Sequence, residues 1–301
     1  MRNIIFFGGS GFIGLYFVKE LINQGHNVLV YDFNKPNFSH KKLKFVKGNI
    51  LDIKKINKII KKDSYVFNFA AWSDIGSGEK NKKKVFDYNV KGNSAILNLC
   101  KKRKIKRFFF ASSIYVFSRY GGAYKNSKQQ CEINIKKSNV KSTIIRFGSI
   151  YGPDSSDGNT IYDLLKMAIQ KGKITYWGKG DEVRQYIHVR DTAKICRKIF
   201  SNEYEKKSVL ITGLEDIRSY DLLNIINEMF NKKIKIKYKY SKRSVSHYKN
   251  TPFSIFKNPK YIPENSEKII LENYTDIGQG IYELANHLIK KFKKNKDKIS
   301  I

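Results

Sequence analysis

The chain has 301 residues, 41% of them hydrophobic and 14% aromatic, which predicts a folded protein with a large core and excludes a disordered chain. No apolar run approaches the ~18 residues of a membrane span, and the first strand-like run starts so early that we expect no signal peptide. The net charge of +33 would ordinarily favour a nucleic-acid partner, but the lysines are spread along the chain, so we expect none. Cys100, Cys131 and Cys196 are an odd number without metal-ligand spacing, which predicts buried, reduced thiols in a cytoplasmic protein and no metal site.

The most informative stretch of the chain is its N-terminal unit, which ends at Asp32. Its apolar and glycine pattern predicts a buried strand, a glycine loop, a helix and a second strand, at residues 3–7, 8–14, 15–24 and 28–31. In the loop, Gly8 suits a tight turn, Gly11 the approach of backbone N–H groups to a pyrophosphate, and Gly14 close packing of helix on strand. Asp32 lies 18 residues beyond Gly14, near the spacing of a carboxylate that binds an adenosine ribose. We therefore predict a dinucleotide-binding site here.

Strand and helix candidates alternate through residue 150, which predicts an α/β fold with a Rossmann-type, doubly wound parallel sheet. The further strand candidates are residues 44–47, 65–69, 108–111 and 142–147, with a helix over 53–61 between the first two. Ligands of such sheets bind beyond the carboxyl ends of the strands, so the loops after these strands should converge on one cleft. Beyond Tyr151 the pattern becomes irregular, which predicts a smaller second lobe; the apolar run 209–212 predicts a late strand that interweaves the two parts.

Two of these elements carry candidate catalytic groups. Ser113 follows a buried strand, and Tyr124 and Lys128 lie four positions apart, on one face of a predicted helix. An ammonium group beside a phenol favours the phenolate, so we expect the pKa of Tyr124 to lie below its usual ~10. Such a tyrosine can act as the general base for a hydroxyl group, while the Ser113 hydroxyl holds the same substrate oxygen.

With these motifs in this order, the chain resembles the extended short-chain dehydrogenase/reductase superfamily, and within it the nucleotide-sugar epimerases and dehydratases. The resemblance covers essentially the whole length. It implies NAD as the cofactor, a nucleotide-diphosphate sugar as the substrate, and Ser113, Tyr124 and Lys128 as the catalytic residues. It also implies cofactor contacts from the glycine loop and from the loops after later strands: Gly8, Ser10, Gly11, Phe12, Ile13, Gly14, Asp32, Asn49, Ile50, Phe69, Ala70, Ala71, Tyr124, Lys128 and Phe147.

The same resemblance implies four substrate contacts. Trp72 would offer a flat platform to the sugar and Asp74 an acceptor for its hydroxyl groups, although a loop that merely packs is an open alternative for both. Ser149 stands where the family usually has an asparagine that touches the substrate. Arg184 matches an arginine that grips the substrate diphosphate, a task suited to a planar, bidentate donor. Asn89 matches a structural asparagine.

We expect an enzyme that oxidises the C4 hydroxyl of a nucleotide-linked hexose or heptose, as a C4 dehydrogenase or a 4-epimerase, in the biosynthesis of surface polysaccharides. A 4,6-dehydratase is an alternative, disfavoured because Ile114 and Tyr115 occupy the positions where those enzymes carry an acidic pair. An alternative from another class is a Rossmann protein that senses NAD and binds a polyanion.

Domain boundaries and assembly follow from the same resemblance. Residues 1–152 are expected to form the NAD-binding domain, rejoined by about 184–213, with 153–183 and 214–301 as a substrate-binding lobe. Two helices, from about Val85 to Lys102 and from Tyr124 to Lys136, carry apolar residues beyond the needs of one sheet face. The family pairs such helices across a two-fold axis, so we predict a homodimer.

Overall fold

The computed structural model describes residues 1–239, 247–255 and 261–297, the last four of these by their backbone alone. The chain divides into two compact units. Unit 1 comprises residues 1–147, 192–211 and 252–271, and unit 2 comprises residues 148–191, 212–251 and 272–301. Within the described ranges, no helix combines the length and the apolar character that a membrane span requires.

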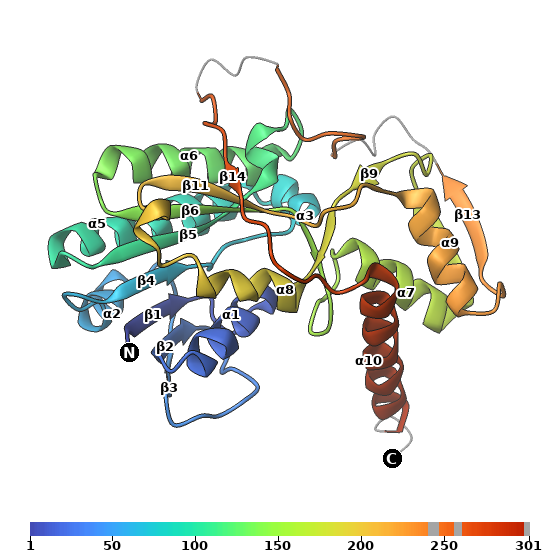
Figure 1. The fold of residues 1–301 in the computed structure, drawn as a ribbon, viewed down its shortest axis with the longest axis horizontal. Coiled ribbons are helices and arrows are strands. Elements are labelled where there is room, and N and C mark those ends of the chain that lie inside the picture. The colour runs from blue at the N-terminus through green and yellow to red at the C-terminus, as the bar shows by residue number, and fades with distance from the viewer. Residues whose placement is uncertain (240–246, 256–260, 298–301) are drawn as a thin grey trace. The chain divides into compact units, whose positions relative to one another are not determined.

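Unit 1 is built on a parallel sheet of eight strands in the order β14-β11-β6-β5-β4-β1-β2-β3 (Figure 1). The strands are β1 (Asn3–Phe7), β2 (Asn27–Asp32), β3 (Leu43–Lys47), β4 (Tyr65–Asn68), β5 (Arg107–Ser113), β6 (Ser142–Phe147), β11 (Lys207–Ile211) and β14 (Glu267–Lys268). The prediction of a Rossmann-type α/β fold is thus confirmed. The register pairs Phe7 with Asn68 and Ser113 with Phe147, so the carboxyl ends of the central strands lie along one edge.

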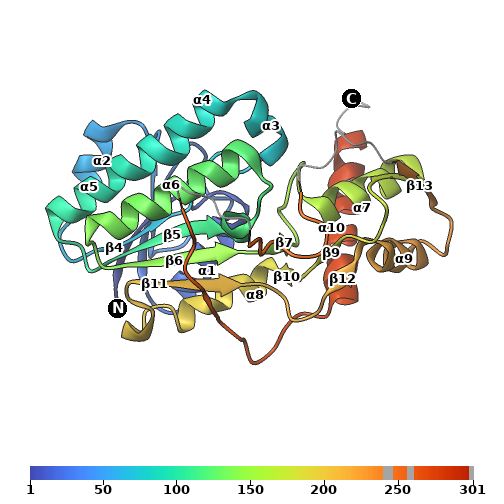
Figure 2. The same cartoon turned by 90° about the horizontal axis from the view of Figure 1, so that it is seen from above.

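Helices cover both faces of this sheet. Helix α1 packs on one face, and α2, α5 and α6 pack on the other (Figure 2). The helices and helical turns up to residue 138 are α1 (Phe12–Asn23), α2 (Ile53–Ile59), α3 (Ile75–Lys80), α4 (Lys82–Val85), the π-helical η1 (Phe86–Gly92), α5 (Asn93–Arg103), the 3₁₀ turn η2 (Ile114–Phe117) and α6 (Gly122–Ser138). The single helix predicted from about Val85 to Lys102 is therefore divided into three parts, with a π-helical turn of the kind often found at functional sites.

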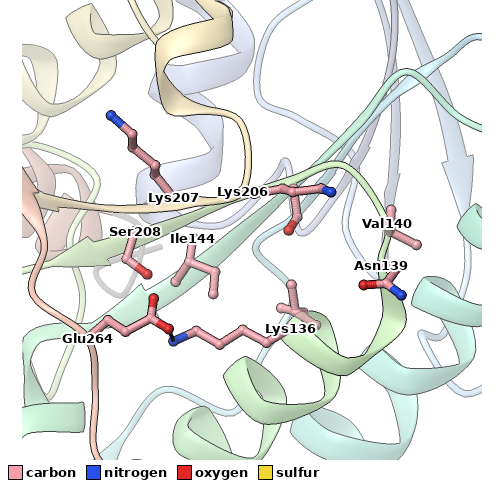
Figure 3. Close-up of a pocket in the computed structure, with 10 residues that line it drawn as sticks. Lys136, Asn139, Val140, Ile144, Lys206, Lys207, Ser208 and Glu264 are labelled. Atoms are coloured by element: carbon pink, nitrogen blue, oxygen red, sulfur yellow. Dashed lines mark ion pairs between the residues drawn. The ribbon is translucent and has the colours of Figure 1, made fainter.

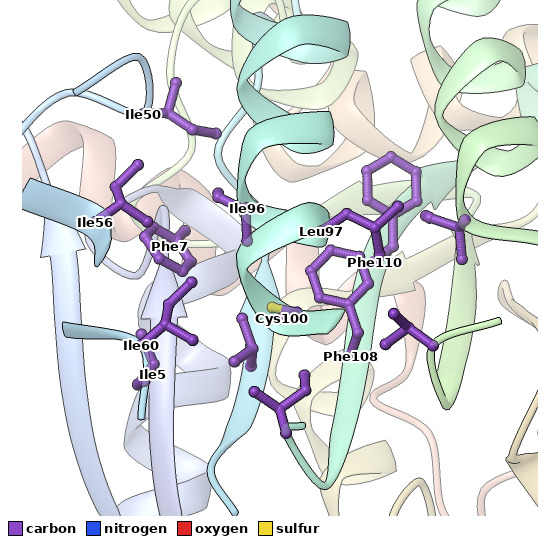
Figure 4. Packing of buried hydrophobic residues seen from close by; sticks show 14 of the residues in the cluster. Ile5, Phe7, Ile50, Ile56, Ile60, Ile96, Leu97, Cys100, Phe108 and Phe110 are labelled. Carbon is purple, nitrogen blue, oxygen red and sulfur yellow. The ribbon is translucent and has the colours of Figure 1, made fainter. Parts of the chain in front are cut away.

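The face beneath α2, α5 and α6 is lined by aliphatic and aromatic residues, because alternate residues of each strand point toward these helices. Figure 4 shows this packing around Cys100, which lies between the helices and the strands. The labelled members of the cluster are Ile5, Phe7, Ile50, Ile56, Ile60, Ile96, Leu97, Cys100, Phe108 and Phe110. All three cysteines are free and buried, as predicted. Of the large apolar residues of η1, α5 and α6, only Phe86 is prominently exposed, at 49%.

The opposite face is aromatic. Phe67 stacks on Phe6 and on Phe109, with ring centroids 5.1 and 4.2 Å apart. Phe17 of α1 contacts Phe6 from outside the sheet, with a centroid distance of 6.5 Å. Aromatic pairs of this kind contribute about 0.5–1.5 kcal/mol each beyond the apolar area that they bury. Both faces of the sheet are thus sealed, which leaves its strand ends for function.

The described residues of unit 2 form a core of their own and three small sheets. β7 pairs with β10 and β8 with β13 in parallel, while β9 pairs with β12 antiparallel. The strands after β6 in this unit are β7 (Ser149–Tyr151), β8 (Lys173–Trp177), β9 (Val183–Arg184), β10 (Tyr186–His188), β12 (Ile217–Arg218) and β13 (Lys235–Lys239). The remaining helices and turns of the chain are α7 (Thr160–Lys171), α8 (Val189–Lys194), η3 (Ile195–Arg197), η4 (Asn202–Tyr204), α9 (Ser219–Met229) and α10 (Ile277–Asp297). Apolar residues of α7, α9 and α10 meet in the core of the unit.

The division of the chain differs from the predicted domains chiefly in three stretches: residues 148–152 and 184–191 belong to unit 2, and residues 252–271 belong to unit 1. The sequence predicts that residues 214–301 belong to a second lobe, whereas residues 252–271 are part of unit 1. The reason is β14, a two-residue strand that pairs with β11 and adds an edge to the large sheet. So short a strand has no recognisable periodicity in the sequence.

Candidate active site

The glycine loop after β1 has the geometry that a dinucleotide site requires. Gly8 has a φ of +79°, which favours glycine, and a Cβ there would lie 2.5 Å from the backbone nitrogen of Ala70. A Cβ on Gly14 would lie 2.1 Å from the carbonyl oxygen of Gly8, so glycine is required for α1 to pack on the loop. At Gly11 the nearest atom would be an ordinary 3.5 Å away. The fold itself therefore demands Gly8 and Gly14, while Gly11 keeps the loop open at the start of α1, where backbone N–H groups attract a pyrophosphate.

Asp32 lies at the end of β2, directly beside this loop. Its two carboxylate oxygens accept hydrogen bonds from the backbone nitrogens of Ser10, at 3.0 Å, and of Asn34, at 3.2 Å. The hydroxyl of Ser10 donates to the carbonyl oxygen of Asn34 at 2.6 Å. These bonds hold the carboxylate at the rim of the loop, where an acceptor for a ribose hydroxyl is needed.

Two further predicted cofactor residues follow β3. The carbonyl oxygen of Asn49 accepts from the Tyr31 hydroxyl at 3.0 Å, and its side-chain oxygen accepts from the backbone nitrogen of Leu51 at 2.9 Å. Ile50 is buried, and its side chain packs on Gly92, where a Cβ would lie 3.0 Å away. Asn49 thus shapes the turn before α2.

The loop after β4 closes the same edge of the sheet. The backbone nitrogen of Phe69 donates to the carbonyl oxygen of Phe7 at 2.9 Å, which continues the sheet pairing into the loop. The Phe69 ring contacts Phe147 at the end of β6, with centroids 5.5 Å apart. The structure therefore brings the loop Phe69, Ala70 and Ala71 next to both Gly8 and Phe147.

The candidate catalytic pair meets beyond the end of β5. Ser113 is the last residue of that strand and is buried, and its side chain also accepts from the backbone nitrogen of Tyr115 at 3.3 Å. Tyr124 lies in the first turn of α6 and is half-buried. The Ser113 hydroxyl is hydrogen-bonded to the Tyr124 phenol. Two hydroxyl groups that belong to different elements thus converge at one point, where they can share one substrate oxygen.

Lys128 lies one turn after Tyr124 on α6 and is buried. Its Nζ donates to the carbonyl oxygen of Ala111 at 2.6 Å. The same nitrogen lies 5.7 Å from the centre of the Tyr124 ring and 4.9 Å from that of Phe110. The three predicted catalytic residues are therefore neighbours, with the ammonium group anchored to the backbone of β5.

The electrostatics of this group differ from the sequence prediction. Burial raises the pKa of Tyr124 to about 12, and its hydrogen bond with Ser113 offsets this only in part. Burial also lowers the pKa of Lys128 to about 8, against the opposing charges of Cys131 and Glu132. The prediction that Lys128 lowers the pKa of Tyr124 is therefore wrong for the protein by itself. The physical reason is that desolvation of the phenolate outweighs an ammonium group that bonds to Ala111 rather than to the phenol.

The loop predicted to face the sugar is held in place from within unit 1. The carboxylate of Asp74 accepts from the backbone nitrogen of Ser77 at 3.0 Å and so caps the short helix α3. The indole nitrogen of Trp72 donates to the Ser77 hydroxyl at 3.0 Å. Asp74 thus has a structural task in any case, while Trp72 is half-buried and keeps part of its ring accessible.

Asn89 connects this loop with α6. Its side-chain oxygen accepts from the backbone nitrogen of Trp72 at 2.7 Å, and its nitrogen donates to the carbonyl oxygen of Trp72 at 3.1 Å. The same nitrogen donates to the Ser127 hydroxyl at 2.9 Å, and Ser127 in turn bonds to the carbonyl oxygen of Tyr124 at 2.7 Å. The structural role implied for Asn89 is to fix the loop to the helix that carries Tyr124.

Sequence reasoning missed Glu79, whose carboxylate accepts from the backbone nitrogen of Ala123 in the first turn of α6. This bond lowers the pKa of Glu79. The N-cap residue Gly121 has no side chain to bond the orphan N–H groups of the helix, so Glu79 supplies the acceptor from another element. In the sequence, the signal was that this helix begins at Gly121 and Gly122, which have no side chain to accept a hydrogen bond from its first N–H groups.

The two remaining predicted substrate residues lie in unit 2, where they meet at Tyr248. The Tyr248 hydroxyl is hydrogen-bonded to the side chain of Ser149. The guanidinium of Arg184 lies 3.9 Å from the Tyr248 ring centre and donates to the carbonyl oxygens of Tyr248, at 2.6 Å, and of Lys249, at 3.0 Å. Sequence reasoning missed Tyr248, because nothing in a run of lysines and serines marks one tyrosine as the anchor.

Within the described part of the chain, no group of His, Cys, Asp and Glu side chains could hold a metal ion. At the positions where a 4,6-dehydratase carries acids, Ile114 is buried and the Tyr115 ring lies against Gly121, where a Cβ would be 2.8 Å away.

Comparisons with known proteins define the class. The model of the NAD dependent epimerase/dehydratase family matches residues 4–211. A UDP-glucose 4-epimerase of Lactobacillus helveticus is 27% identical over 250 residues, which are 71% of this chain and 74% of that protein. A dTDP-D-glucose 4,6-dehydratase of Dictyostelium discoideum is 26% identical over 236 residues, 64% of this chain and 54% of that protein. The solved UDP-glucose 4-epimerase of Thermotoga maritima with UDP-glucose has a TM-score of 0.78 at 19% identity and covers 97% of this chain and 100% of its own.

The chain belongs to the NAD-dependent epimerase/dehydratase family, and the resemblance noted from its motifs is thereby confirmed. The family is one of NAD-dependent enzymes of nucleotide-sugar chemistry, and NAD is accordingly the cofactor of its class. The loop geometry agrees with this cofactor: Gly8 and Gly14 leave no room for side chains on the protein side, and Asp32 borders the loop.

Proposed function

We propose that the protein oxidises the C4 hydroxyl of a nucleotide-diphosphate sugar, a hexose or a heptose, in the synthesis of surface polysaccharides. The observation that carries this proposal is the hydrogen bond between Ser113 and Tyr124 beside the buried ammonium of Lys128. A hydroxyl of the substrate that enters this point meets a proton acceptor and a second hydrogen-bonding group at once.

Each catalytic residue has one task. Tyr124 takes the proton of the sugar hydroxyl, and Ser113 orients the same oxygen by a hydrogen bond. Lys128 keeps a positive charge near the phenol and stabilises the phenolate as it forms. NAD held by these residues would supply the hydride acceptor for C4.

The residues proposed to hold NAD lie along the carboxyl edge of the sheet in unit 1. The loop Gly8–Gly14 would bind the pyrophosphate through its backbone, with contacts from Ser10, Phe12 and Ile13. Asp32 would bind the adenosine ribose, Asn49 and Ile50 would border the adenine, and Lys128 would reach the nicotinamide ribose. The loop of Phe69, Ala70 and Ala71 would line the cofactor together with Phe147, which it already contacts.

The proposed substrate residues fall into two groups. In unit 1, Trp72 would stack on the sugar and Asp74 would accept from its hydroxyl groups. In unit 2, Arg184 would grip the diphosphate and Ser149 would bond to the substrate. The hydrogen-bond geometry of a guanidinium suits a diphosphate, and in the structure this guanidinium bonds to the carbonyl oxygens of Tyr248 and Lys249.

The outcome after oxidation depends on how long the ketone stays bound. If the 4-keto sugar is reduced on its other face before release, the enzyme is a 4-epimerase; if it leaves, the enzyme is a C4 dehydrogenase. We expect no loss of water, because Ile114 and Tyr115 provide no carboxylic acid where the related dehydratases carry two.

To test the proposal, the purified protein is incubated with NAD and with UDP-, GDP- and CDP-linked hexoses and heptoses. The masses of the products are then measured by mass spectrometry. Epimerisation leaves the mass unchanged, oxidation removes two hydrogens, and dehydration removes one water. Mass spectrometry of small molecules that co-purify with the protein would narrow the choice of sugar. A product that has lost water, or full activity in Tyr124→Phe, would contradict the proposal.

A further inference from the structure

A fully buried carboxylate lies on α6, one turn after Lys128. Glu132 has an exposure of 0%, yet four donors reach its two oxygens. Oε1 accepts from the Ser112 hydroxyl at 2.5 Å and from Nε of Arg146 at 3.0 Å. Oε2 accepts from Nη2 of Arg146 at 2.7 Å and from the hydroxyl of Tyr261. The bidentate ion pair with Arg146 by itself would neutralise the charge of Glu132. The hydrogen bonds from Ser112 and Tyr261 therefore need another explanation.

The donors come from the elements that carry the catalytic residues. Ser112 precedes Ser113 on β5, and Glu132 follows Lys128 on α6. Arg146 lies near the end of β6, and its guanidinium lies 4.7 Å from the centre of the Phe117 ring, in the turn that follows Ser113. Glu132 is therefore the point where side chains join β5, β6 and α6.

Tyr261 reaches this point from a segment far away in the sequence, residues 261–268, which we call the strap. Nη1 of Arg146 donates to the carbonyl oxygen of Glu264 at 2.6 Å and to the hydroxyl of Ser266 at 2.7 Å. Lys136 of α6 pairs with the carboxylate of Glu264 at 2.9 Å (Figure 3), and its Nζ lies 5.6 Å from the centre of the Tyr261 ring. The strap is thus fixed to β6 through Arg146 and to α6 through Lys136, and the phenol of Tyr261 reaches Glu132.

An isolated buried ion pair contributes little net stability, because its desolvation cost offsets its attraction. Four hydrogen bonds to one carboxylate instead fix the position of the Glu132 side chain. The bond between Ser113 and Tyr124 and the bond between Lys128 and Ala111 both span the gap between β5 and α6. Their geometry depends on the separation of these two elements, which Glu132 holds through Ser112.

We propose that Glu132 is a positioning residue of the reaction and that Tyr261 of the strap locks it in place. The inference rests on the proposed function, since it concerns the residues assigned to that reaction. Glu132 fixes the position of Ser113 through its bond with Ser112. It fixes the position of the Lys128 ammonium group through the turn of α6 that separates the two residues. Its negative charge also favours the ammonium form of Lys128.

The groups that face Glu132 determine which variants are informative. The titratable and charged groups around it in the described residues are Arg146 from β6, Tyr261 from the strap, and Lys128 and Cys131 from α6. Glu132→Gln removes the carboxylate partner of the buried Arg146 guanidinium, a change that destabilises the fold. Tyr261→Phe keeps the ring and the ion pair and removes only the hydroxyl that locks the carboxylate.

The test compares kcat and its pH dependence in Tyr261→Phe, Glu132→Gln and Glu205→Gln. Glu205 pairs with the largely buried Arg107 at the other end of β5, at 3.2 Å, so its variant controls for the loss of an ion pair. We expect kcat to fall by about threefold to tenfold in Tyr261→Phe and by up to about 10²-fold in Glu132→Gln, since small displacements at a reacting centre have effects of this size. In Glu132→Gln the alkaline break of the pH profile, set by Lys128, should also move to lower pH.

Glu205→Gln should lower the melting temperature without changing kcat or the pH profile. If Tyr261→Phe and Glu132→Gln behave like this control, Glu132 is merely structural and the inference is overturned. If Glu132→Gln does not fold, an unchanged kcat in Tyr261→Phe overturns it alone. A wild-type protein that oxidises none of the sugars overturns the proposed function itself, whereas active wild type with unaffected variants overturns only this inference.

Discussion

The ammonium group of Lys128 is bonded to the carbonyl oxygen of Ala111, 2.6 Å away, at a place from which water is excluded. This bond joins α6 to β5, the strand that carries Ser113. The pKa of Tyr124 nevertheless lies above its usual value, because desolvation of the phenolate outweighs the attraction of the nearby ammonium group. The protein by itself therefore holds a neutral phenol next to a lysine that titrates near neutral pH.

This pairing predicts the pH dependence of activity. For kcat/KM with NAD as the varied ligand, which reports the protein before binding, we expect a rise of about tenfold per pH unit up to about pH 8. The rise reflects the growing fraction of phenolate, because the pKa of Tyr124 is about 12. Above about pH 8 the profile should level off, since Lys128, with a pKa of about 8, then loses its proton. Initial rates across this range check the prediction, with Lys125→Met as control; a flat profile below pH 8 would contradict it.

Tyr124→Phe removes the titrating oxygen with little change of shape. We expect kcat to fall by about 10² to 10⁴-fold, the range typical of general acid–base groups, while the dissociation constant of the nucleotide sugar stays nearly constant. Calorimetry and initial rates measure the two quantities. Tyr65→Phe is the matched control, because Tyr65 packs on Phe200 at the other end of the sheet. A comparable loss in that variant would indicate a folding defect.

Asp32 should select NAD over NADP. Its carboxylate is held beside the loop by two backbone N–H groups, so a 2′-phosphate would meet a fixed negative charge. We expect a dissociation constant for NADP at least about tenfold above that for NAD, and a smaller ratio in Asp32→Asn. Fluorescence titration measures the ratio, with Asp63→Asn as a remote control. Tighter binding of NADP by the wild type would disprove the role of Asp32.

His26 should make the fold sensitive to acid. It is buried, its Nε2 bonds to the guanidinium of Arg2 at 3.2 Å, and burial lowers its pKa from 6.5 to about 4. Because the unfolded chain binds this proton more readily, the free energy of unfolding should decrease as the pH falls from about 6.5 to about 4, by about 2–3 kcal/mol. Above pH 6.5 the contribution is fully present.

Urea denaturation at several pH values measures this loss. His26→Gln should show a weaker pH dependence than wild type, and the exposed His40→Gln should match wild type. Identical profiles for all three proteins would assign the acid sensitivity to carboxylates instead.

We predict a homodimer that pairs α5 and α6 across a two-fold axis. Leu99 and Ile133 are half-buried on these helices and would become covered in such a dimer. Light scattering at micromolar concentration checks the mass, and Ile133→Asp should yield a monomer. A wild-type monomer under these conditions would disprove the dimer.

The sheet could be predicted from the sequence because each central strand is a short apolar run that a turn residue ends. The same runs place Ser113 at a strand end, and helical spacing places Tyr124 and Lys128 on one face. The partner of a buried charge was harder to find. Arg146 is a lone cation in the apolar run 142–147, which indicates a buried acid, and Glu132 follows Lys128 by one helical turn.

Contacts across long sequence separations could not be predicted. Tyr261 lies 129 residues after Glu132, and nothing in its surroundings distinguishes it from the other tyrosines of the chain. The pKa of Tyr124 was mispredicted for a related reason. Spacing along a helix gives the distance between two groups, but the cost of burying a charge depends on everything packed around it.

The strap, which ends in the short strand β14, has a consequence for the design of fragments and chimeras of this protein. Unit 1 is assembled from three separate stretches of sequence, so a fragment that ends at residue 211 would lack the partners of Arg146 at Glu264 and Ser266. The buried pair of Arg146 and Glu132 would then face solvent on one side. Exchange of substrate-binding parts between relatives must therefore respect several crossover points and keep residues 252–271 with the parent that supplies α6.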